Sequence, residues 1–166
     1  MTTNGEGISQ TNVGLGKIAV VRAPHVLVSI GVGSCVILCL YHENSKTAGM
    51  AHIMLGCTNS SRTDPDKPAK FAELAVENLL KEFAKRGIRE PSSLWAKIVG
   101  GAQLFVFKQV PNIGDINVEA AKEALDKYGI SIMASDVGGT ASRSVWFYAE
   151  TGRVIVKSRR EIRQEL

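Results

Sequence analysis

The chain has few cysteines and no long uncharged segment, and these two shortages exclude several classes of protein. Its 166 residues include only three cysteines, an odd number that argues against a disulfide framework. The longest uncharged run, residues 26–41, spans 16 residues and is interrupted by glycines and serines, so it is too short and too flexible to cross a membrane. No basic start followed by an apolar stretch is present, so we expect no secretory signal and predict a cytoplasmic protein without direct membrane insertion.

Positive charge is only slightly in excess, and most of this excess comes from residues near one end of the chain. Lys and Arg number 20 against 16 Asp and Glu, and residues 153–166 alone carry five basic and two acidic side chains. The rest of the chain is therefore near neutral, whereas nucleic-acid-binding proteins present a basic face. We expect no nucleic-acid partner, and we interpret residues 158–166 as a basic C-terminal tail.

Length and composition predict one globular domain. With 166 residues, of which 45% are hydrophobic, the chain can bury a sizeable core without help from disulfides or metals. Residues 1–16 are rich in Thr, Asn, Gly and Ser and show no periodicity, so they are predicted to form a flexible N-terminal segment. The domain is expected to occupy residues 17–157.

Short segments rich in β-branched residues predict strands at both ends of this domain. The polar residues 42–46 predict a turn that joins two of these strands into a hairpin, and residues 56–70 form the longest predicted loop. About eight strands are expected, at residues 18–21, 26–29, 34–41, 47–55, 95–99, 130–135, 144–148 and 153–156.

Two amphipathic helices are predicted between the two groups of strands. Apolar residues recur at helical spacing over residues 68–86, and Gly87 follows where a helix would end. Asn117 is predicted to cap a second helix, which would end at Gly129. Because strands and helices do not alternate along the chain, the pattern favours an α+β fold over a doubly wound sheet.

Cys35 is a candidate nucleophile because it follows a glycine-rich turn. Two glycines allow a tight turn, and a nucleophile at the start of the next strand can have backbone N–H groups aimed at a developing oxyanion. The N–H groups around Gly33 and Ser34 are the candidates for this role. The apolar residues that follow Cys35 favour a second interpretation, in which its thiol is simply a small buried hydrophobic group.

His52 lies in an apolar strand, which is unusual for histidine. If this strand pairs with the one that begins at Cys35, the two side chains can lie side by side, and an imidazole next to a thiol favours the thiolate and imidazolium forms. The alternative interpretation is a buried histidine that is hydrogen-bonded to a backbone carbonyl.

A metal site is not expected, although Cys35, Cys39, His42, His52 and Cys57 lie in one segment. Cys35 and Cys39 in one extended strand are about 13 Å apart at roughly 3.3 Å per residue, too far for one zinc ion with bonds of about 2.3 Å. Their spacing also matches no familiar ligand pattern.

The chain resembles the CheD family of chemoreceptor glutamine deamidases. The resemblance covers residues 17–157 and is carried by five segments in the same order: 29–35 (SIGVGSC), 49–55 (GMAHIML), 97–102 (KIVGGA), Ile113-Gly114 with Asn117, and 136–139 (DVGG) with Arg143.

This resemblance implies a β-sandwich-like core with two main flanking helices and a cytosolic enzyme of bacterial or archaeal chemotaxis. Such an enzyme converts glutamine side chains on receptor cytoplasmic helices to glutamate without a cofactor. By position, the family's cysteine nucleophile falls on Cys35, its histidine base on His52, and its threonine on Ser29. Serine keeps the hydroxyl that can bond an imidazole nitrogen but lacks the methyl group that restricts the rotamer of threonine.

Two alternatives to a deamidase follow from the same residues. The resemblance also implies binding of a CheC-type response-regulator phosphatase, which members of the family share, so the chain could be a catalytically weak regulatory partner of such a phosphatase. A cysteine protease or a methylesterase would use the same acyl-enzyme chemistry on other substrates.

Overall fold

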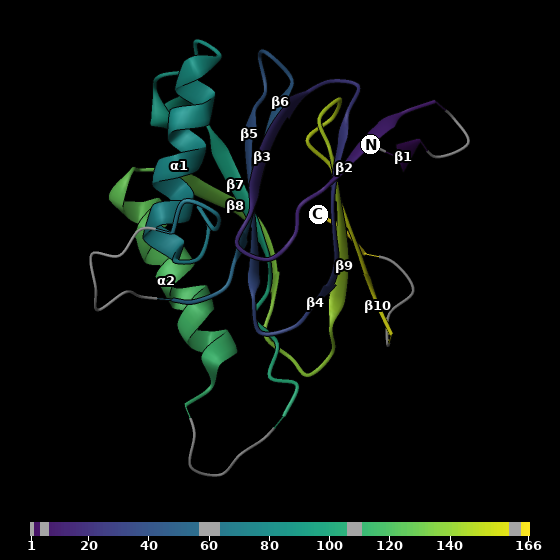
Figure 1. Cartoon of the computed structure of the whole chain (residues 1–166), viewed down its shortest axis with the longest axis vertical. Coiled ribbons are helices and arrows are strands. Elements are labelled where there is room, and N and C mark those ends of the chain that lie inside the picture. The colour runs from purple at the N-terminus through teal and green to yellow at the C-terminus, as the bar shows by residue number, and fades with distance from the viewer. Residues whose placement is uncertain (1, 4–6, 57–63, 106–110, 160–163) are drawn as a thin grey trace.

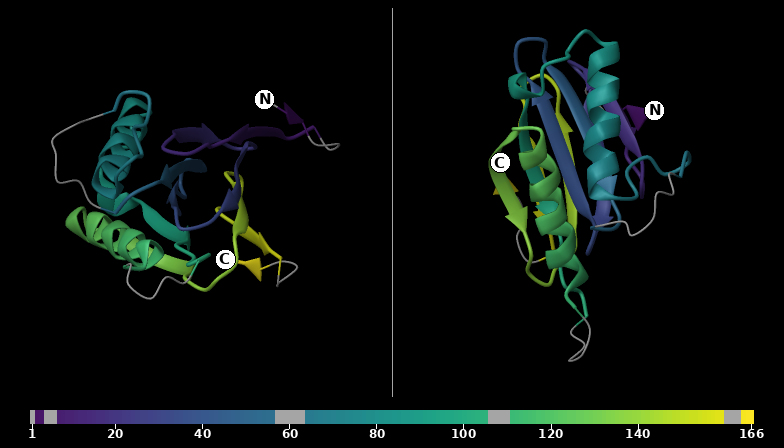
Figure 2. Two further views of the ribbon diagram at one scale, coloured as in Figure 1. Left: turned by 60° about the horizontal axis from the view of Figure 1, so that its bottom comes forward. Right: turned by 90° about the vertical axis from the view of Figure 1, so that its left-hand side faces the viewer.

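The protein folds into three layers: a pair of helices, a five-stranded sheet and a six-stranded sheet (Figure 1). The computed structural model describes residues 2–3, 7–56, 64–105, 111–159 and 164–166. Both helices lie on the same outer face of the five-stranded sheet, and the six-stranded sheet packs against its other face, as the two turned views in Figure 2 make clear. This arrangement confirms the predicted α+β sandwich with flanking helices.

The five-stranded sheet is built around a hairpin whose two strands are almost entirely buried. Its strands lie in the order β3 (Ile18–Arg22), β6 (Thr47–Ile53), β5 (Val36–His42), β7 (Trp95–Gly100) and β8 (Ser131–Val137). All pairs are antiparallel except β7 with β8. Because β5 and β6 are buried on both faces, they are almost continuously apolar rather than alternating.

The six-stranded sheet contains short strands near both chain ends. Its order is β1 (Thr2–Thr3), β2 (Ser9–Asn12), β4 (Val26–Val32), β9 (Arg143–Tyr148), β10 (Val154–Ser158) and β11 (Gln164–Glu165). Strand β4 carries a bulge between Ser29 and Val32, where Gly31 has a positive φ of 70°. A bulge bends its strand, and this one lies immediately before the turn that leads to Cys35.

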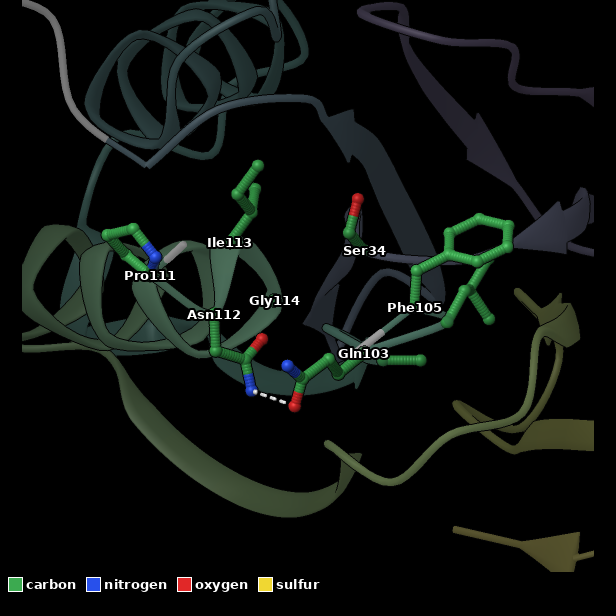
Figure 3. A pocket seen from close by; sticks show the side chains of 9 residues that line it. Ser34, Gln103, Phe105, Pro111, Asn112, Ile113 and Gly114 are labelled. Atoms are coloured by element: carbon green, nitrogen blue, oxygen red, sulfur yellow. Dashed lines mark hydrogen bonds between the residues drawn. The ribbon is translucent and has the colours of Figure 1, made fainter. Parts of the chain in front are cut away.

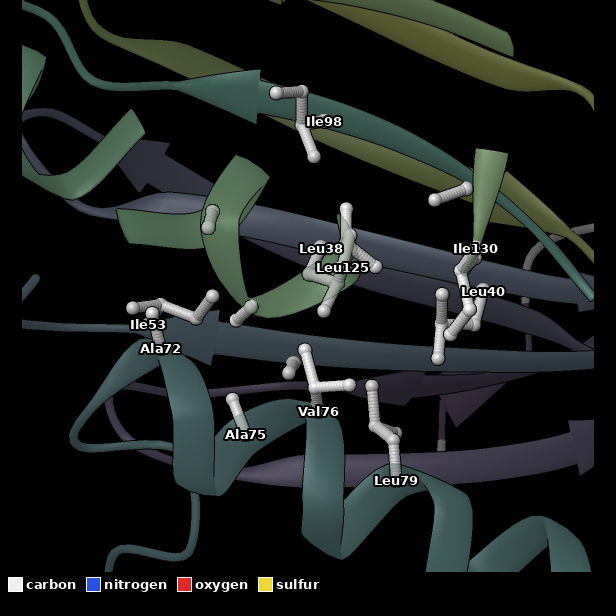
Figure 4. Close-up of a cluster of buried hydrophobic side chains, with 14 of the residues drawn as sticks. Leu38, Leu40, Ile53, Ala72, Ala75, Val76, Leu79, Ile98, Leu125 and Ile130 are labelled. Atoms are coloured by element: carbon white, nitrogen blue, oxygen red, sulfur yellow. The ribbon is translucent and has the colours of Figure 1, made fainter. Parts of the chain in front are cut away.

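The helices cover the outer face of the hairpin. Two helices, α1 (Ala72–Lys85) and α2 (Ile113–Lys127), each bury an apolar stripe in a cluster shared with β5, β6 and β7. A short 3-10 helix, η1 (Pro91–Ser93), leads into β7. Figure 4 shows Val76 and Leu79 of α1 and Leu125 of α2 gathered on Leu38 and Leu40 of β5. A second buried cluster fills the space between the two sheets.

The structure differs from the sequence-based expectations at both ends and at one helix. Helix α2 begins at Ile113 with Asn112 as its cap, so the prediction that Asn117 caps this helix is wrong. The pattern gave no reason to expect β2, which pairs in parallel with β4, or β11, which pairs with β10. Both strands are short, with four and two residues, and β2 is held by a strand that follows it at a distance, so neither leaves a clear local periodicity.

Two further expectations can be compared with the structure only within the described residues. Cys57 and the rest of residues 57–63, just under half of the predicted loop over residues 56–70, lie outside them. Within the part of the chain that the structure describes, no helix combines the length and the apolar character needed to cross a membrane.

Candidate active site

The β5–β6 hairpin brings Cys35 and His52 to the same face of the sheet. Ile37 lies directly opposite His52, and Cys35 is two residues before Ile37, so Cys35 and His52 are diagonal neighbours. Such neighbours have Cα atoms about 7–8 Å apart, with side chains on one face. That face looks into the space between the two sheets, where Cys35 packs against the inner cluster. Cys35 is partly exposed and His52 is buried.

The backbone around Cys35 is anchored on three sides through its carbonyl groups. Gly33 O accepts from Ala102 N at 2.9 Å, Ser34 O accepts from the Asn117 side chain at 2.8 Å, and Cys35 O accepts from Gly101 N at 2.8 Å. Among the described residues, no backbone carbonyl accepts from the N–H group of Ser34 or from that of Cys35. Three hydrogen bonds therefore hold the turn that the sequence marks as a candidate oxyanion site, and the N–H of Cys35 faces its own thiol.

Close backbone contacts explain the glycines opposite this turn. A Cβ on Gly100, whose φ is 117°, would lie 2.3 Å from Cys35 O. Gly101 has a φ of 65° and packs equally closely against helix α2. Both positions need a residue without a side chain, because the neighbouring atoms are backbone or buried.

The imidazole of His52 is oriented by a backbone carbonyl. Its Nδ1 lies 3.2 Å from Val13 O. A carbonyl can only accept, so Nδ1 carries the proton and Nε2 of the neutral ring carries the free lone pair. The ring is thus held in the tautomer that a general base at Nε2 requires.

Ser29 supports the same carbonyl rather than the imidazole itself. Its buried hydroxyl donates to Val13 O at 2.6 Å and lies 3.7 Å from Met50 Sδ. The resemblance implied a hydroxyl that bonds an imidazole nitrogen, whereas here the hydroxyl and the imidazole meet at one shared acceptor. Sequence reasoning missed Val13, because nothing in the pattern of residues 1–16 shows that this segment runs beside β4.

Burial favours the neutral forms of both candidate groups. It raises the pKa of the Cys35 thiol, and the residue's own backbone N–H opposes this only in part. It lowers the pKa of His52, with the Val13 hydrogen bond as the smaller, opposing cause. These directions are the reverse of the thiolate and imidazolium pair expected from the sequence. They describe a resting state with a thiol and a neutral imidazole.

A cavity of about 220 Å³ opens beside the Cys35 turn. Figure 3 shows it between Ser34 and Phe105 on one side and the start of helix α2 on the other, with Asn112 Nδ2 donating to Gln103 Oε1 at 3.3 Å along its floor. Pockets for drug-sized ligands are larger, about 300–1,000 Å³, so this cavity suits a single side chain. It is lined by Ser34, Ala102, Gln103, Leu104, Phe105, Pro111, Asn112, Ile113 and Gly114.

The other cysteine and histidine residues in the described chain do not join this site. Cys39 is fully buried in β5, and His42 bonds Ser45 in the hairpin turn. Among the described residues, no three His, Cys, Asp or Glu side chains stand together as metal ligands.

Comparisons with known proteins find one family along this chain. The sequence model of the family described as "CheD chemotactic sensory transduction" matches residues 54–158. A protein of Caldanaerobacter subterraneus named "Probable chemoreceptor glutamine deamidase CheD" is 43% identical over 149 residues, which cover 88% of this chain and 91% of that protein.

Two further relatives carry the corresponding name without the word "probable". The "Chemoreceptor glutamine deamidase CheD" of Thermotoga maritima is 43% identical over 145 residues, covering 87% of this chain and 89% of the relative. That of Halalkalibacterium halodurans is 40% identical over 149 residues, covering 88% and 91%. Because the family model matches more than half of the chain and these relatives align with nearly all of it, this chain belongs to the CheD family.

Proposed function

We propose that this protein is a chemoreceptor glutamine deamidase, which hydrolyses glutamine side chains on receptor cytoplasmic helices to glutamate and ammonia. Its membership of the CheD family and the names of its relatives support this activity. The observation that carries the assignment is the position of Cys35 and His52 on one face of the β5–β6 hairpin, beside a rigid turn. We propose that the enzyme acts in the cytoplasm, where those helices lie.

In the first half of the reaction, Cys35 forms a thioester with the substrate. His52 Nε2 takes the thiol proton as Sγ attacks the carboxamide carbon, and the carbonyl oxygen becomes an oxyanion near the N–H groups of the Gly33–Ser34–Cys35 turn. The imidazolium then gives its proton to the amide nitrogen, the C–N bond breaks, and ammonia leaves.

In the second half, water restores the enzyme. His52 Nε2 takes a proton from a water molecule, whose oxygen attacks the thioester carbon, and the C–S bond breaks as the thiolate recovers a proton. The product is glutamate, and no external oxidant or cofactor is needed.

The neutral resting state is consistent with this scheme. A general base must be unprotonated before it acts, and the lowered pKa of His52 keeps it so. The raised pKa of Cys35 means that the thiol ionises as the imidazole takes its proton, so the reactive thiolate forms in the reaction and not in the free enzyme.

An apolar rim around the Cys35 turn suits a helical substrate. Most of the large exposed hydrophobic side chains of the described residues lie on segments that lead into or out of the candidate site, such as Leu104, which touches Gly33. Exposed apolar patches of this kind mark protein interaction sites. Three of these side chains, Leu104, Phe105 and Ile113, line the cavity beside Ser34 and form this rim.

The proposed activity is tested on a purified receptor cytoplasmic domain that carries glutamine at its modification sites. We expect the wild-type protein to release ammonia and to increase the mass of the domain by about 1 Da per site, because an NH₂ group is replaced by OH. The Cys35→Ala variant should do neither while keeping the wild-type circular dichroism spectrum. Undiminished ammonia release from this variant would refute the assignment of Cys35.

The same assay separates the alternatives. A protease would cleave the receptor domain, and a methylesterase would remove methyl groups instead of ammonia. A catalytically weak regulator of a CheC-type phosphatase would leave the receptor domain unchanged. Cys39→Ala is the matched control, because this cysteine is buried two residues from Ile37 and away from the turn.

A further inference from the structure

Asn117 is a buried polar residue in the second turn of helix α2 that the proposed chemistry does not use. Its side chain has no exposed surface. The Nδ2 group donates to Ser34 O at 2.8 Å and to Met54 O at 3.2 Å. Both partners lie on other segments of the chain, so this amide connects three elements of the fold.

The chemistry of the partners fixes the orientation of the amide. Two carbonyl oxygens can only accept, so the nitrogen of Asn117 and not its oxygen must face them. The Oδ1 atom is left buried, and it has no hydrogen-bond partner among the described residues. A buried, unpaired acceptor is unfavourable, and the residue is therefore placed for its two donated bonds.

The two carbonyls mark the open end of the catalytic hairpin. Pairing between β5 and β6 ends at Val36 and Ile53, and strand hydrogen bonds no longer join the two segments beyond that point. Ser34 comes immediately before Cys35, and Met54 is two residues after His52. Asn117 therefore replaces the missing ladder bonds as the link between the segment of the nucleophile and that of the base.

Helix α2 gives this link a rigid support. Gly114 packs so closely on the β7 end that a Cβ there would lie 2.2 Å from Gly101 O. Gly101 N in turn donates to Cys35 O at 2.8 Å. The helix that carries Asn117 is thus fixed against the backbone that holds Cys35 from the opposite side.

We propose that Asn117 is a positioning residue that sets the placement of Cys35 relative to His52 by bridging Ser34 and Met54. The proposal rests on the proposed deamidase function, because it assigns a role in that reaction. Asn117 touches no reacting atom and acts only through the two backbone segments. Its loss should slow the chemical step while leaving the binding of the receptor helix unchanged.

Two substitutions test this role. Asn117→Asp keeps the shape of the side chain but turns an acceptor toward two carbonyls, and Asn117→Ala removes the link altogether. We expect both to lower kcat by roughly 10- to 100-fold, the usual cost of a displacement of about 1 Å in a reacting group, with KM changed by less than about twofold. Leu125→Ala is the matched control: it is buried on the same helix, two turns away, and should reduce stability without changing kcat.

The pH dependence of Asn117→Asp gives a readout that a purely structural role would not produce. A buried carboxyl that faces two carbonyls has a raised pKa, and its protonated form regains one donor. The ratio of its kcat to that of the wild type should therefore increase as the pH is lowered. A ratio that stays constant or decreases toward acid pH would contradict the bridging role.

A measurement without substrate separates this proposal from the proposed function. The alkylation rate of Cys35 by iodoacetamide, followed by peptide mass spectrometry, should change in both Asn117 variants and remain at the wild-type value in Leu125→Ala. This rate tests the placement of the thiol even if the wild-type protein releases no ammonia. Three outcomes would overturn the proposal. The first is a folded Asn117 variant with the wild-type kcat and alkylation rate, and the second is an equal loss of kcat in Leu125→Ala. The third is failure of both Asn117 variants to fold.

Discussion

Replacing Ser29 with alanine tests how the imidazole is held. In the structure, the hydroxyl of Ser29 and Nδ1 of His52 both donate to Val13 O, at 2.6 Å and 3.2 Å respectively. Ser29→Ala removes one of these two bonds and leaves the other. The carbonyl therefore keeps a partner, and the imidazole keeps the bond that fixes its tautomer.

The expected effect is moderate on stability and small on catalysis. Loss of one buried hydrogen bond with no unpaired group left behind costs about 0.5–1.5 kcal/mol. In a protein of this size, each kcal/mol lowers Tm by about 2–4 °C. Since His52 retains its orientation, kcat should decrease by less than about tenfold, which corresponds to 1.36 kcal/mol of activation free energy.

Thermal unfolding and ammonia release from the receptor domain measure the two effects separately. Ser144→Ala is a suitable control, because it also removes a serine–backbone bond, from Gly31 N at 3.2 Å, on the neighbouring strand and away from His52. A loss of kcat above about 100-fold with an unchanged Tm would refute the reasoning, because loss of a directly acting acid–base group has effects of that size. Ser29 would then contact the imidazole or the substrate during the reaction.

Three further results are expected. Burial lowers the pKa of His52 below its usual value of 6.5, so the unfolded chain binds more protons than the folded one between the two pKa values. The free energy of unfolding should therefore fall as the pH drops below about 6.5 and level off below the pKa of the folded state. Urea titrations of the wild type and of His52→Gln at several pH values check this, and an equal dependence on pH in both would contradict it. Asp136→Asn breaks the 3.0 Å ion pair with the mostly buried Arg143 and should cost about 1–3 kcal/mol in urea unfolding; no change would mean that the pair is not stabilising. Gly114→Ala forces the helix away from Gly101 O and should lower the free energy of unfolding by about 1–3 kcal/mol together with kcat, whereas unchanged kcat would argue against the role of this contact.

The position of Cys35 and His52 on one face of the hairpin could be predicted, because it depends on local rules. A short polar turn between two apolar runs specifies a hairpin, and alternation along each strand then decides which residues share a face. The outer helix α1 was equally readable, since its apolar stripe has helical spacing. The resemblance of the five segments points to the same two residues, Cys35 and His52, as candidates for the nucleophile and the base.

The supports of the site could not be predicted, since they come from residues distant in sequence. Val13 orients His52 from a strand that pairs in parallel with β4, and no periodicity marks that segment. Asparagine is common at helix caps, so the sequence predicts Asn117 as the cap; in the structure Asn112 has that role and Asn117 is buried against the turn. A residue's propensity describes only its local preference, and the burial of a side chain depends on which segments pack around it.

The sequence by itself determined the family, the α+β class and the two candidate reacting groups, because each can be recognised from short stretches of neighbouring residues. Only the tertiary structure decided the state and the setting of those groups. Burial between the sheets makes the neutral thiol and imidazole the resting forms. The imidazole donates to Val13 O, and Asn117 donates to Ser34 O in the turn that carries Cys35. Both effects arise from desolvation and contacts that exist only when distant segments are packed together.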